Sequence, residues 1–283
     1  VLFKPTDALR GLTNASIQYY LKEQKDTITF EIYDTRDQLI NTFTGSKPKY
    51  EVDPNIPYWL KGGSSKPTTA KGINTFTWDM RYTGATTFDG MIIWSARPAR
   101  GPKAPLGTYK VKMKSGDYEK TYAFEIKMDP NLKGITKEDL DEQFELSNKI
   151  MGKTTAANET VIKIREIKKT LNDVKDEIDI TDLNNTIMPF INELSEVEEA
   201  LYQVKNQSGQ DPLNFPIKLN NRLASLRRSV ESGEAKPTNG AYKVFEELSA
   251  ELEIELNKFN RVMQKYKVKV NPFLSKNDGT VID

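Results

Sequence analysis

The spacing of hydrophobic residues changes once along the chain, between Phe124 and Leu140. Before this stretch, hydrophobic and polar residues alternate, which is typical of strands with one buried face. After it, hydrophobic residues recur every three or four positions, which is typical of amphipathic helices. The change falls at Asp129-Pro130-Asn131, where proline can end a strand but cannot continue a helix. We therefore expect a β domain over residues 1–130 and a helical domain over residues 131–283, an α+β multidomain chain.

The alternating part contains about seven short segments, a number typical of an antiparallel β-sandwich. The segments on either side of the turn at Asp34–Asp37 should pair as a hairpin. Four prolines and Gly62-Gly63 interrupt residues 44–72, so we expect a long loop there. Phe88–Trp94 is predicted to be another strand, and Arg97–Pro105 a loop. The expected core of the sandwich consists of Phe30, Ile32, Trp78, Tyr109, Val111, Tyr122 and Phe124.

The second part predicts about four long helices joined by short loops, the pattern of an antiparallel up-down bundle. The first should run from about Lys137 to Ile178, with Thr136 as its cap and a weak point at Gly152. Pro189 should kink the second helix or delay its start. Asp211-Pro212 should open the third and Pro237-Thr238 the fourth. The tail from Lys267 to Asp283 is predicted to be irregular or to dock locally.

The composition excludes several classes of catalytic and metal-binding site. The chain has no Cys and no His, which excludes disulfides, thiol nucleophiles, Cys/His zinc sites and Ser-His-Asp triads. No hydrophobic run approaches the roughly 20 residues that span a bilayer. The β part has 19 Lys and Arg against 14 Asp and Glu. Because this excess of +5 is not concentrated on one segment, we expect no nucleic-acid partner. A start at Val1 suggests a piece of a longer protein.

Two segments of the β part carry a family resemblance. Asn74–Tyr82 (NTFTWDMRY) resembles the pattern N-R-F-x-W-D-L-R-Y, with Thr75 where the pattern has Arg. Gly101–Val111 (GPKAPLGTYKV) resembles G-P-x-A-x-P-G-T-Y-x-V. Both patterns belong to the C-terminal region of bacterial (Bacteroidetes-type) sortilin-like or BNR-repeat glycosyl hydrolase family proteins. Further segments that resemble this region are Met128-Asp129-Pro130, Asp211–Leu219 and Lys236-Pro237-Thr238.

The resemblance covers nearly the whole chain and implies several properties. It implies an Ig-like β-sandwich akin to flagellar hook-cap domains, an extracytoplasmic location, and a β-propeller upstream in the same parent chain. Any glycosidase site of such a parent would lie in the propeller, so the family's hydrolase label says little about this segment. We accordingly expect no catalytic residue, cofactor or metal ion here.

The sequence offers few candidate site residues. Tyr58, Trp59 and Trp94 are the best candidates for stacking on sugar rings, because aromatic residues in or beside loops often bind ligands. Their alternative role is packing inside the protein or against a neighbouring domain. Arg97 and Arg100, with Lys103, form a basic loop that suits an acidic partner surface or is simply solvated.

Three further patterns have a structural interpretation that we prefer. In Trp78-Asp79-Met80-Arg81, we expect Trp78 to be buried in the core rather than to line a ligand site. The carboxylate groups at Glu138–Glu142 and Glu196–Glu199 resemble acid pairs of glycosidases. Because these helices carry many charges, we expect the carboxylates to lie on solvated helix faces. Asp34–Asp37 has too few oxygen ligands for a calcium loop such as an EF-hand.

These observations lead to one main hypothesis and two alternatives. The main hypothesis is a non-catalytic accessory region that supports or docks onto an upstream domain. The first alternative is a module that binds glycan or peptide. The second, which the sequence favours least, is a free-standing glycoside hydrolase.

Overall fold

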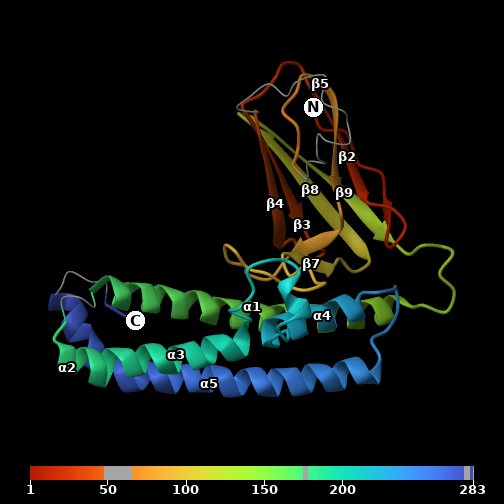
Figure 1. Ribbon diagram of the computed structural model, residues 1–283. Helices are drawn as coiled ribbons and strands as arrows, with labels where there is room; N and C mark the ends of the chain where they lie inside the picture. The colour runs from red at the N-terminus through yellow and green to blue at the C-terminus, as the bar shows by residue number, and fades with distance from the viewer. Residues whose placement is uncertain (48–65, 175–177, 277–280, 283) are drawn as a thin grey trace. The chain divides into compact units, whose positions relative to one another are not determined.

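The computed structural model describes residues 1–47, 66–174, 178–276 and 281–282 (Figure 1). It is an α+β structure that separates into two compact units. We call them the β unit and the helical unit and describe each by itself. The β unit comprises Val1–Thr83, Pro102–Phe144 and Gly233–Lys236; the helical unit comprises Gly84–Gly101, Glu145–Ser232 and Pro237–Asp283.

Within the described residues, the strands form one curled five-stranded sheet and two small ones. The five-stranded sheet has the order β1-β9-β8-β3-β4 and is mixed, because β1 runs parallel to β9 while the other neighbours are antiparallel. The antiparallel pair β2-β5 and the pair β6-β7 complete the set. The strands are β1 (Ala8–Leu9), β2 (Ala15–Leu21), β3 (Thr27–Tyr33), β4 (Leu39–Ser46), β5 (Gly72–Trp78), β6 (Arg81–Thr83), β7 (Arg100–Lys103), β8 (Gly107–Ser115) and β9 (Tyr118–Lys127).

The predicted hairpin is the β3-β4 pair. Its turn is held by the buried carboxylate of Asp34, whose Oδ1 accepts hydrogen bonds from the backbone N–H groups of Arg36 (2.9 Å) and Gln38 (3.0 Å). Asp37 adopts a positive φ of 61°, which Asp tolerates better than most residues. β4 continues to Ser46, so the first residues of the predicted loop over residues 44–72 belong to a strand. Residues 48–65 lie outside the described part.

The core of the β unit contains the residues expected from the alternation. Phe30, Ile32, Trp78, Tyr109, Val111 and Phe124 are all buried, while Tyr122 packs against them only partly buried. The prediction for the Trp78 motif is confirmed: the indole is fully buried, and its Nε1 donates to the backbone oxygen of Arg81 at 3.0 Å. The motif therefore ends a strand and fills the core.

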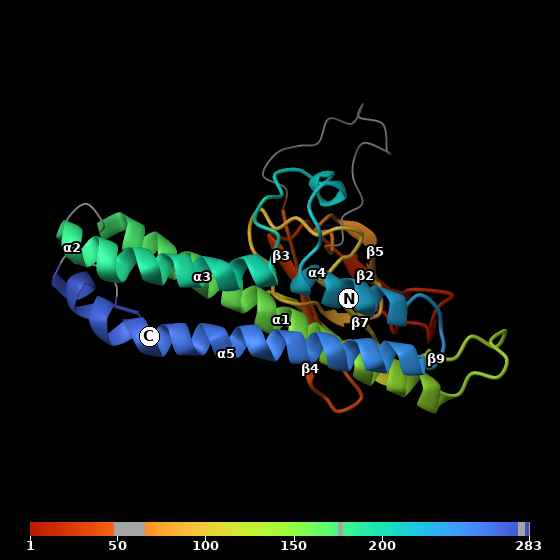
Figure 2. The same ribbon diagram turned by 60° about the horizontal axis from the view of Figure 1, so that its bottom comes forward.

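The helices are α1 (Lys137–Val174), α2 (Ile180–Asp182), α3 (Met188–Leu201), α4 (Leu219–Val230) and α5 (Asn239–Lys276). A π-helical turn, η3 (Leu183–Ile187), precedes α3, and a 3-10 turn, η4 (Asp211–Leu213), precedes α4. Both views show α3 and α5 running side by side along the part of α1 that belongs to the helical unit (Figures 1 and 2). A continuous core of leucine, isoleucine, valine and aromatic side chains joins these helices.

The predicted cap of α1 is confirmed. The backbone N–H of Asp139 donates to Thr136 Oγ1 at 3.2 Å, and Asp139 Oδ2 accepts from the backbone N–H of Thr136 at 2.9 Å. This reciprocal pair satisfies two backbone donors that the helix itself leaves free. The helix then continues through Gly152 to Val174 without a break.

Three predictions of secondary structure are wrong. Phe88–Trp94 forms no strand; Phe88 and Met91 are hydrophobic because they pack against the helix core. The predicted loop Arg97–Pro105 contains β7. The third long helix begins at Leu219, not at Asp211-Pro212, because Pro216 lacks a backbone donor and restricts the residue before it.

The predicted irregular tail is also wrong in part, since α5 continues to Lys276 with Pro272 inside it. Proline in a helix interior costs about 3 kcal/mol. Val270 and Leu274, which flank it, are completely buried. Burial of such side chains yields about 1.5–3 kcal/mol each, which offsets that cost. Of the helices described, none is both long and apolar enough to cross a membrane.

Candidate functional site

The segment that carries most of the predicted site residues, Gly84–Gly101, lies within the helical unit. Asn221 of α4 binds the backbone of this segment near its middle, at Trp94. The backbone N–H of Trp94 donates to Asn221 Oδ1 at 2.7 Å, and Asn221 Nδ2 donates to the Trp94 carbonyl at 3.0 Å. Asn221 is buried, so this two-way contact replaces water on both backbone groups of Trp94.

Two arginines of α4 hold the rest of the segment. Arg227, which is buried, donates from Nη1 to the carbonyl of Gly101 (3.2 Å) and from Nη2 to that of Arg97 (2.9 Å). Arg228 donates to the carbonyl of Ser95 at 2.5 Å and to its hydroxyl. Charged donors make stronger hydrogen bonds than neutral ones. Three side chains of α4 thus hold the backbone of residues 94–101 at four positions, Trp94, Ser95, Arg97 and Gly101.

The structure brings only some of the predicted site residues together. Trp94 is half-buried, whereas the side chains of Arg97 and Arg100 are exposed, although Arg100 also belongs to β7. Tyr58 and Trp59 lie outside the described residues. Lys103 does not extend the basic loop, because its ammonium pairs with the buried carboxylate of Glu234 within the β unit.

A cationic and aromatic cluster supports the first half of the segment. The guanidinium of Arg165 lies 4.7 Å from the ring centre of Phe88 and 5.1 Å from that of Tyr202. Its Nε is 2.6 Å from Oε1 of Glu198, whose other oxygen is 3.0 Å from Lys168 Nζ. The sequence predicts Glu198 on a solvated face, which is wrong, because Glu198 is buried between these two cations. The carboxylate therefore has a structural role, since it pairs with Arg165 and Lys168 inside the helical unit.

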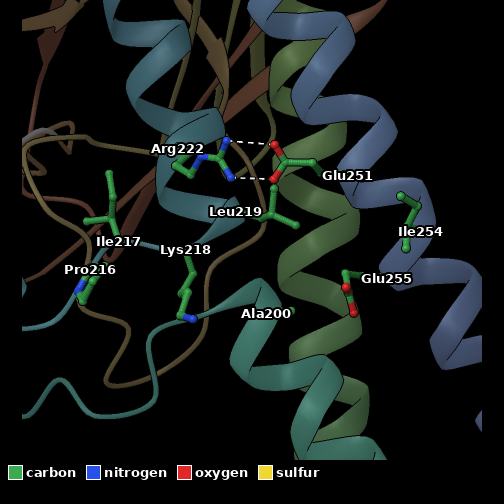
Figure 3. Close-up of a pocket in the computed structure, with 9 residues that line it drawn as sticks. All are labelled: Ala200, Pro216, Ile217, Lys218, Leu219, Arg222, Glu251, Ile254 and Glu255. Atoms are coloured by element: carbon green, nitrogen blue, oxygen red, sulfur yellow. Dashed lines mark hydrogen bonds and ion pairs between the residues drawn. The ribbon is translucent and has the colours of Figure 1, made fainter.

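A surface hollow of the helical unit, with a volume of about 380 Å³, lies between α4, α5 and the segment before α4 (Figure 3). We call it the α4–α5 hollow. Its lining mixes hydrophobic and charged side chains: Ala200, Pro216, Ile217, Lys218, Leu219, Arg222, Glu251, Ile254 and Glu255.

One ion pair closes the upper side of the α4–α5 hollow in Figure 3. Arg222 Nη1 lies 2.5 Å from Glu251 Oε2 and Nη2 lies 2.9 Å from Oε1, a two-point contact. The hydrogen bond from Arg222 lowers the pKa of the Glu251 carboxyl below its usual value of 4.5. Glu251 is therefore held as a carboxylate, which accepts protons poorly at neutral pH and has none to donate.

The other carboxyl of the α4–α5 hollow has a different environment. Oε2 of Glu255 is buried, and no donor among the described residues bonds to it. Lys218 is half-buried, and no carboxylate of the described part pairs with its ammonium. The hollow thus contains one closed ion pair and two opposite charges that are not paired with each other.

Sequence reasoning missed the residues that organise these sites. Asn221 carried a weak signal, because Asn220 and Asn221 are two consecutive asparagines in a helix whose other residues are leucine, arginine, serine, alanine and valine. Glu255 carried none, since α5 has many acidic residues of which most are exposed. Among the residues described, no group of three or more carboxylates has a geometry that could hold a metal ion.

No protein-family model matches this sequence, and no curated protein matches it either. The family resemblance therefore rests on the motifs and on their order along the chain.

Proposed function

We propose that this chain is a non-catalytic accessory region, a structural or docking module, of a larger extracytoplasmic protein. The parent would be of the sortilin-like or BNR-repeat glycosyl hydrolase kind, with an upstream β-propeller as the principal partner. The motifs at Asn74–Tyr82 and Gly101–Val111 support this parentage. Docking would use the segment over residues 94–101.

The proposal includes a finer description of both units. The β unit would be an Ig-like sandwich, supported by a core to which both the five-stranded sheet and the β2-β5 pair contribute side chains. The helical unit would be an antiparallel up-down bundle, supported by the common core of α1, α3, α4 and α5. Each is a scaffold that presents loops from its ends.

The observation that carries the docking proposal is the rigid presentation of exposed basic residues. Asn221, Arg227 and Arg228 bind the backbone of residues 94–101, while the side chains of Arg97 and Arg100 remain exposed. A segment that is already ordered loses less conformational entropy when a partner binds. Arginine is enriched in interfaces because it combines charge with a planar contact surface. An acidic or carbonyl-rich partner face would suit this segment.

The α4–α5 hollow also bears on the choice between binding and catalysis. A glycosidase requires one carboxyl with a raised pKa as its general acid. Of the two carboxyls in the hollow, Glu251 has a lowered pKa and is occupied by Arg222. This environment suits a structural ion pair rather than an acid.

A screen of the chain against aryl-glycosides and polysaccharides tests the non-catalytic proposal. We expect hydrolysis at background. Turnover that disappears in Glu251→Gln or Glu255→Gln, while Glu246→Gln on the exposed side of α5 retains it, would overturn the proposal.

The alternative function is a module that binds glycan or peptide, and Trp94 is the observation in its favour. Its indole is half-buried, in contrast to Trp78, which is completely buried. Titration of tryptophan fluorescence with a panel of polysaccharides would reveal stacking on Trp94. Binding that is lost in Trp94→Ala supports this alternative, and an unchanged emission with every ligand removes Trp94 from consideration.

A further inference from the structure

Strand β5 (Gly72–Trp78) has a single strand neighbour in the described part of the chain, β2 (Figure 1). No backbone hydrogen bond among the described residues reaches the other side of β5. Such a side presents a row of backbone donors and acceptors without partners, and this row is complementary to another extended backbone. We call this side of the strand the β5 edge and consider it as an interaction surface.

The hydrogen bonds of β2 identify the residues that form the β5 edge. The backbone N–H of Tyr20 donates to the Val1 carbonyl at 2.8 Å, and the Tyr20 carbonyl accepts from the Val1 ammonium at 2.7 Å. Tyr20 therefore directs its backbone groups away from β5. Tyr20 lies opposite Ile73, and opposite residues of an antiparallel pair direct these groups either both toward each other or both away. Ile73 thus directs its N–H and C=O to the β5 edge, and alternation adds Thr75 and Thr77.

The side chains along the β5 edge are exposed. Ile73 is 76 % exposed, and Thr75 and Thr77 are exposed on the same face of the strand. A Cβ atom at Gly72 would meet no described atom within 4 Å, so the space at the start of the strand is open. The described residues of the β unit therefore leave the β5 edge accessible.

Other strand edges of the β unit are protected in the usual ways, which are short length, coverage and charge. Strand β1 has only two residues. The outer side of β4 is covered by β6, because Asn41 Nδ2 donates to the Arg81 carbonyl at 2.6 Å. The part of β9 that β1 does not pair with carries Glu119, Lys120 and Glu125. In contrast, β5 has seven residues, of which none is charged or proline.

The β5 edge is complementary to a second copy of itself. When two copies meet antiparallel with their Thr75 residues opposite each other, Ile73 of each copy lies opposite Thr77 of the other. Each of these residues then exchanges its backbone N–H and C=O with its partner. Threonine pairs stabilise adjacent strands, and no like charges are brought together. The net charge of the chain is only +1, so repulsion between two copies is weak.

We propose that the β5 edge joins two copies of this chain into a dimer with a continuous sheet in the order β2-β5-β5-β2. The twofold axis passes between the two Thr75 residues. Because both copies contribute the same edge, the interface is complete with two copies. The dimer does not use residues 94–101, so it and the proposed docking can fail independently.

Sedimentation equilibrium of the full chain over a range of concentrations tests the proposal. We expect the average mass to rise from 32.2 kDa toward twice that value. Thr75→Lys places two ammonium groups opposite each other, and Thr75→Pro removes the central donor of the β5 edge without removing a bond to β2. Both should weaken the dimer at least tenfold. Thr108→Lys is the matched control, because Thr108 is exposed on β8, a strand between β9 and β3.

Oxidation of single-cysteine variants tests the arrangement of the two copies. The chain has no cysteine, so one introduced cysteine can form a disulfide only with a second copy. Residues that exchange backbone hydrogen bonds across antiparallel strands have Cα atoms about 5.5 Å apart, which a disulfide can span. We expect Thr75→Cys to form a covalent dimer at least tenfold faster than Thr108→Cys. A mixture of Ile73→Cys and Thr77→Cys should crosslink faster than either variant alone.

The cysteine variants decide the matter even if the lysine or proline variant fails to fold. Three results would overturn the proposal. One is a monomer mass up to about 1 mM, a concentration that reveals even millimolar affinity. Another is a dimer that Thr75→Lys and Thr75→Pro both retain, which would place the interface elsewhere. The third is protection of the Ile73, Thr75 and Thr77 amides from hydrogen exchange in the dilute monomer, which would show that the chain itself covers the β5 edge.

Discussion

Arg10 Nε lies 2.8 Å from Oε2 of Glu234, and their side chains are only 2 % and 8 % exposed. Arg10 follows β1 at the beginning of the chain, and Glu234 belongs to the connection between α4 and α5. Gln143 of α1 joins them: its Oε1 accepts from Arg10 Nη2 at 2.6 Å, and its Nε2 donates to the Gly233 carbonyl at 2.7 Å. The β unit therefore uses residues from the helical part of the sequence to complete its interior.

The first prediction concerns the strength of this buried pair. Removal of one partner of a buried ion pair leaves the other charge uncompensated and costs about 3–5 kcal/mol. We expect Arg10→Ala to lower the free energy of unfolding by that amount in a urea titration. Arg261→Ala, at an exposed position of α5, should change it by less than about 1 kcal/mol. Equal losses in the two variants would show that the Arg10–Glu234 contact is not stabilising.

The second prediction concerns a cut near Asn131. The sequence predicts that at least one of the two pieces folds alone, with the break after residue 130. In a fragment of residues 1–130, however, Arg10 would lack both Glu234 and Gln143. We expect Arg10→Met to destabilise the full chain more than this fragment, because the fragment has already lost these two partners of the guanidinium. A loss of equal size in both would contradict the role assigned to Arg10.

The third prediction concerns the segment held by α4. Asn221→Ala removes both hydrogen bonds to the Trp94 backbone, and two partly buried backbone groups then lose their partner. We expect a loss of about 1–3 kcal/mol and a red shift of the tryptophan emission as Trp94 becomes more hydrated. Asn260→Ala, at an exposed position of α5, is the matched control. An unchanged emission in Asn221→Ala would show that Trp94 is fixed by other contacts.

The fourth prediction concerns pH. The hydrogen bond from Arg222 lowers the pKa of Glu251 in the folded chain. The pair therefore contributes stability above the usual carboxyl pKa of 4.5 and loses it as the pH falls through the lowered, folded value. In a carbon-detected NMR titration we expect Glu251 to titrate below 4.5, and to return toward that value in Arg222→Gln. An identical titration in both proteins would contradict the assigned cause.

The elements that sequence reasoning predicted well share a physical feature: their signal is local. The hairpin turn at Asp34–Asp37, the cap at Thr136 and the burial of Trp78 each depend on residues within a few positions of one another. Alternation likewise reports a buried strand face directly, as at Phe30 and Ile32.

The failures have a common cause in contacts between distant residues. Phe88 and Met91 are hydrophobic because they cover helices, which periodicity cannot distinguish from a short strand. Pro272 remains inside α5 because Val270 and Leu274 are buried by other helices. The candidate sites depend still more on such contacts. Asn221 and Arg227 act on backbone groups more than 100 positions away, and Glu255 is distinguished only by a donor that it lacks.

Hydrogen exchange tests the docking proposal most directly. The measurement compares this chain alone with a longer chain that includes the residues upstream of Val1. The proposal predicts that residues 94–101, which carry Arg97 and Arg100, become more protected from exchange in the longer chain. It makes the same prediction for residues 48–65, which include Tyr58 and Trp59. Equal exchange of both segments in the two chains, with new protection on α3 and α5 instead, would contradict it.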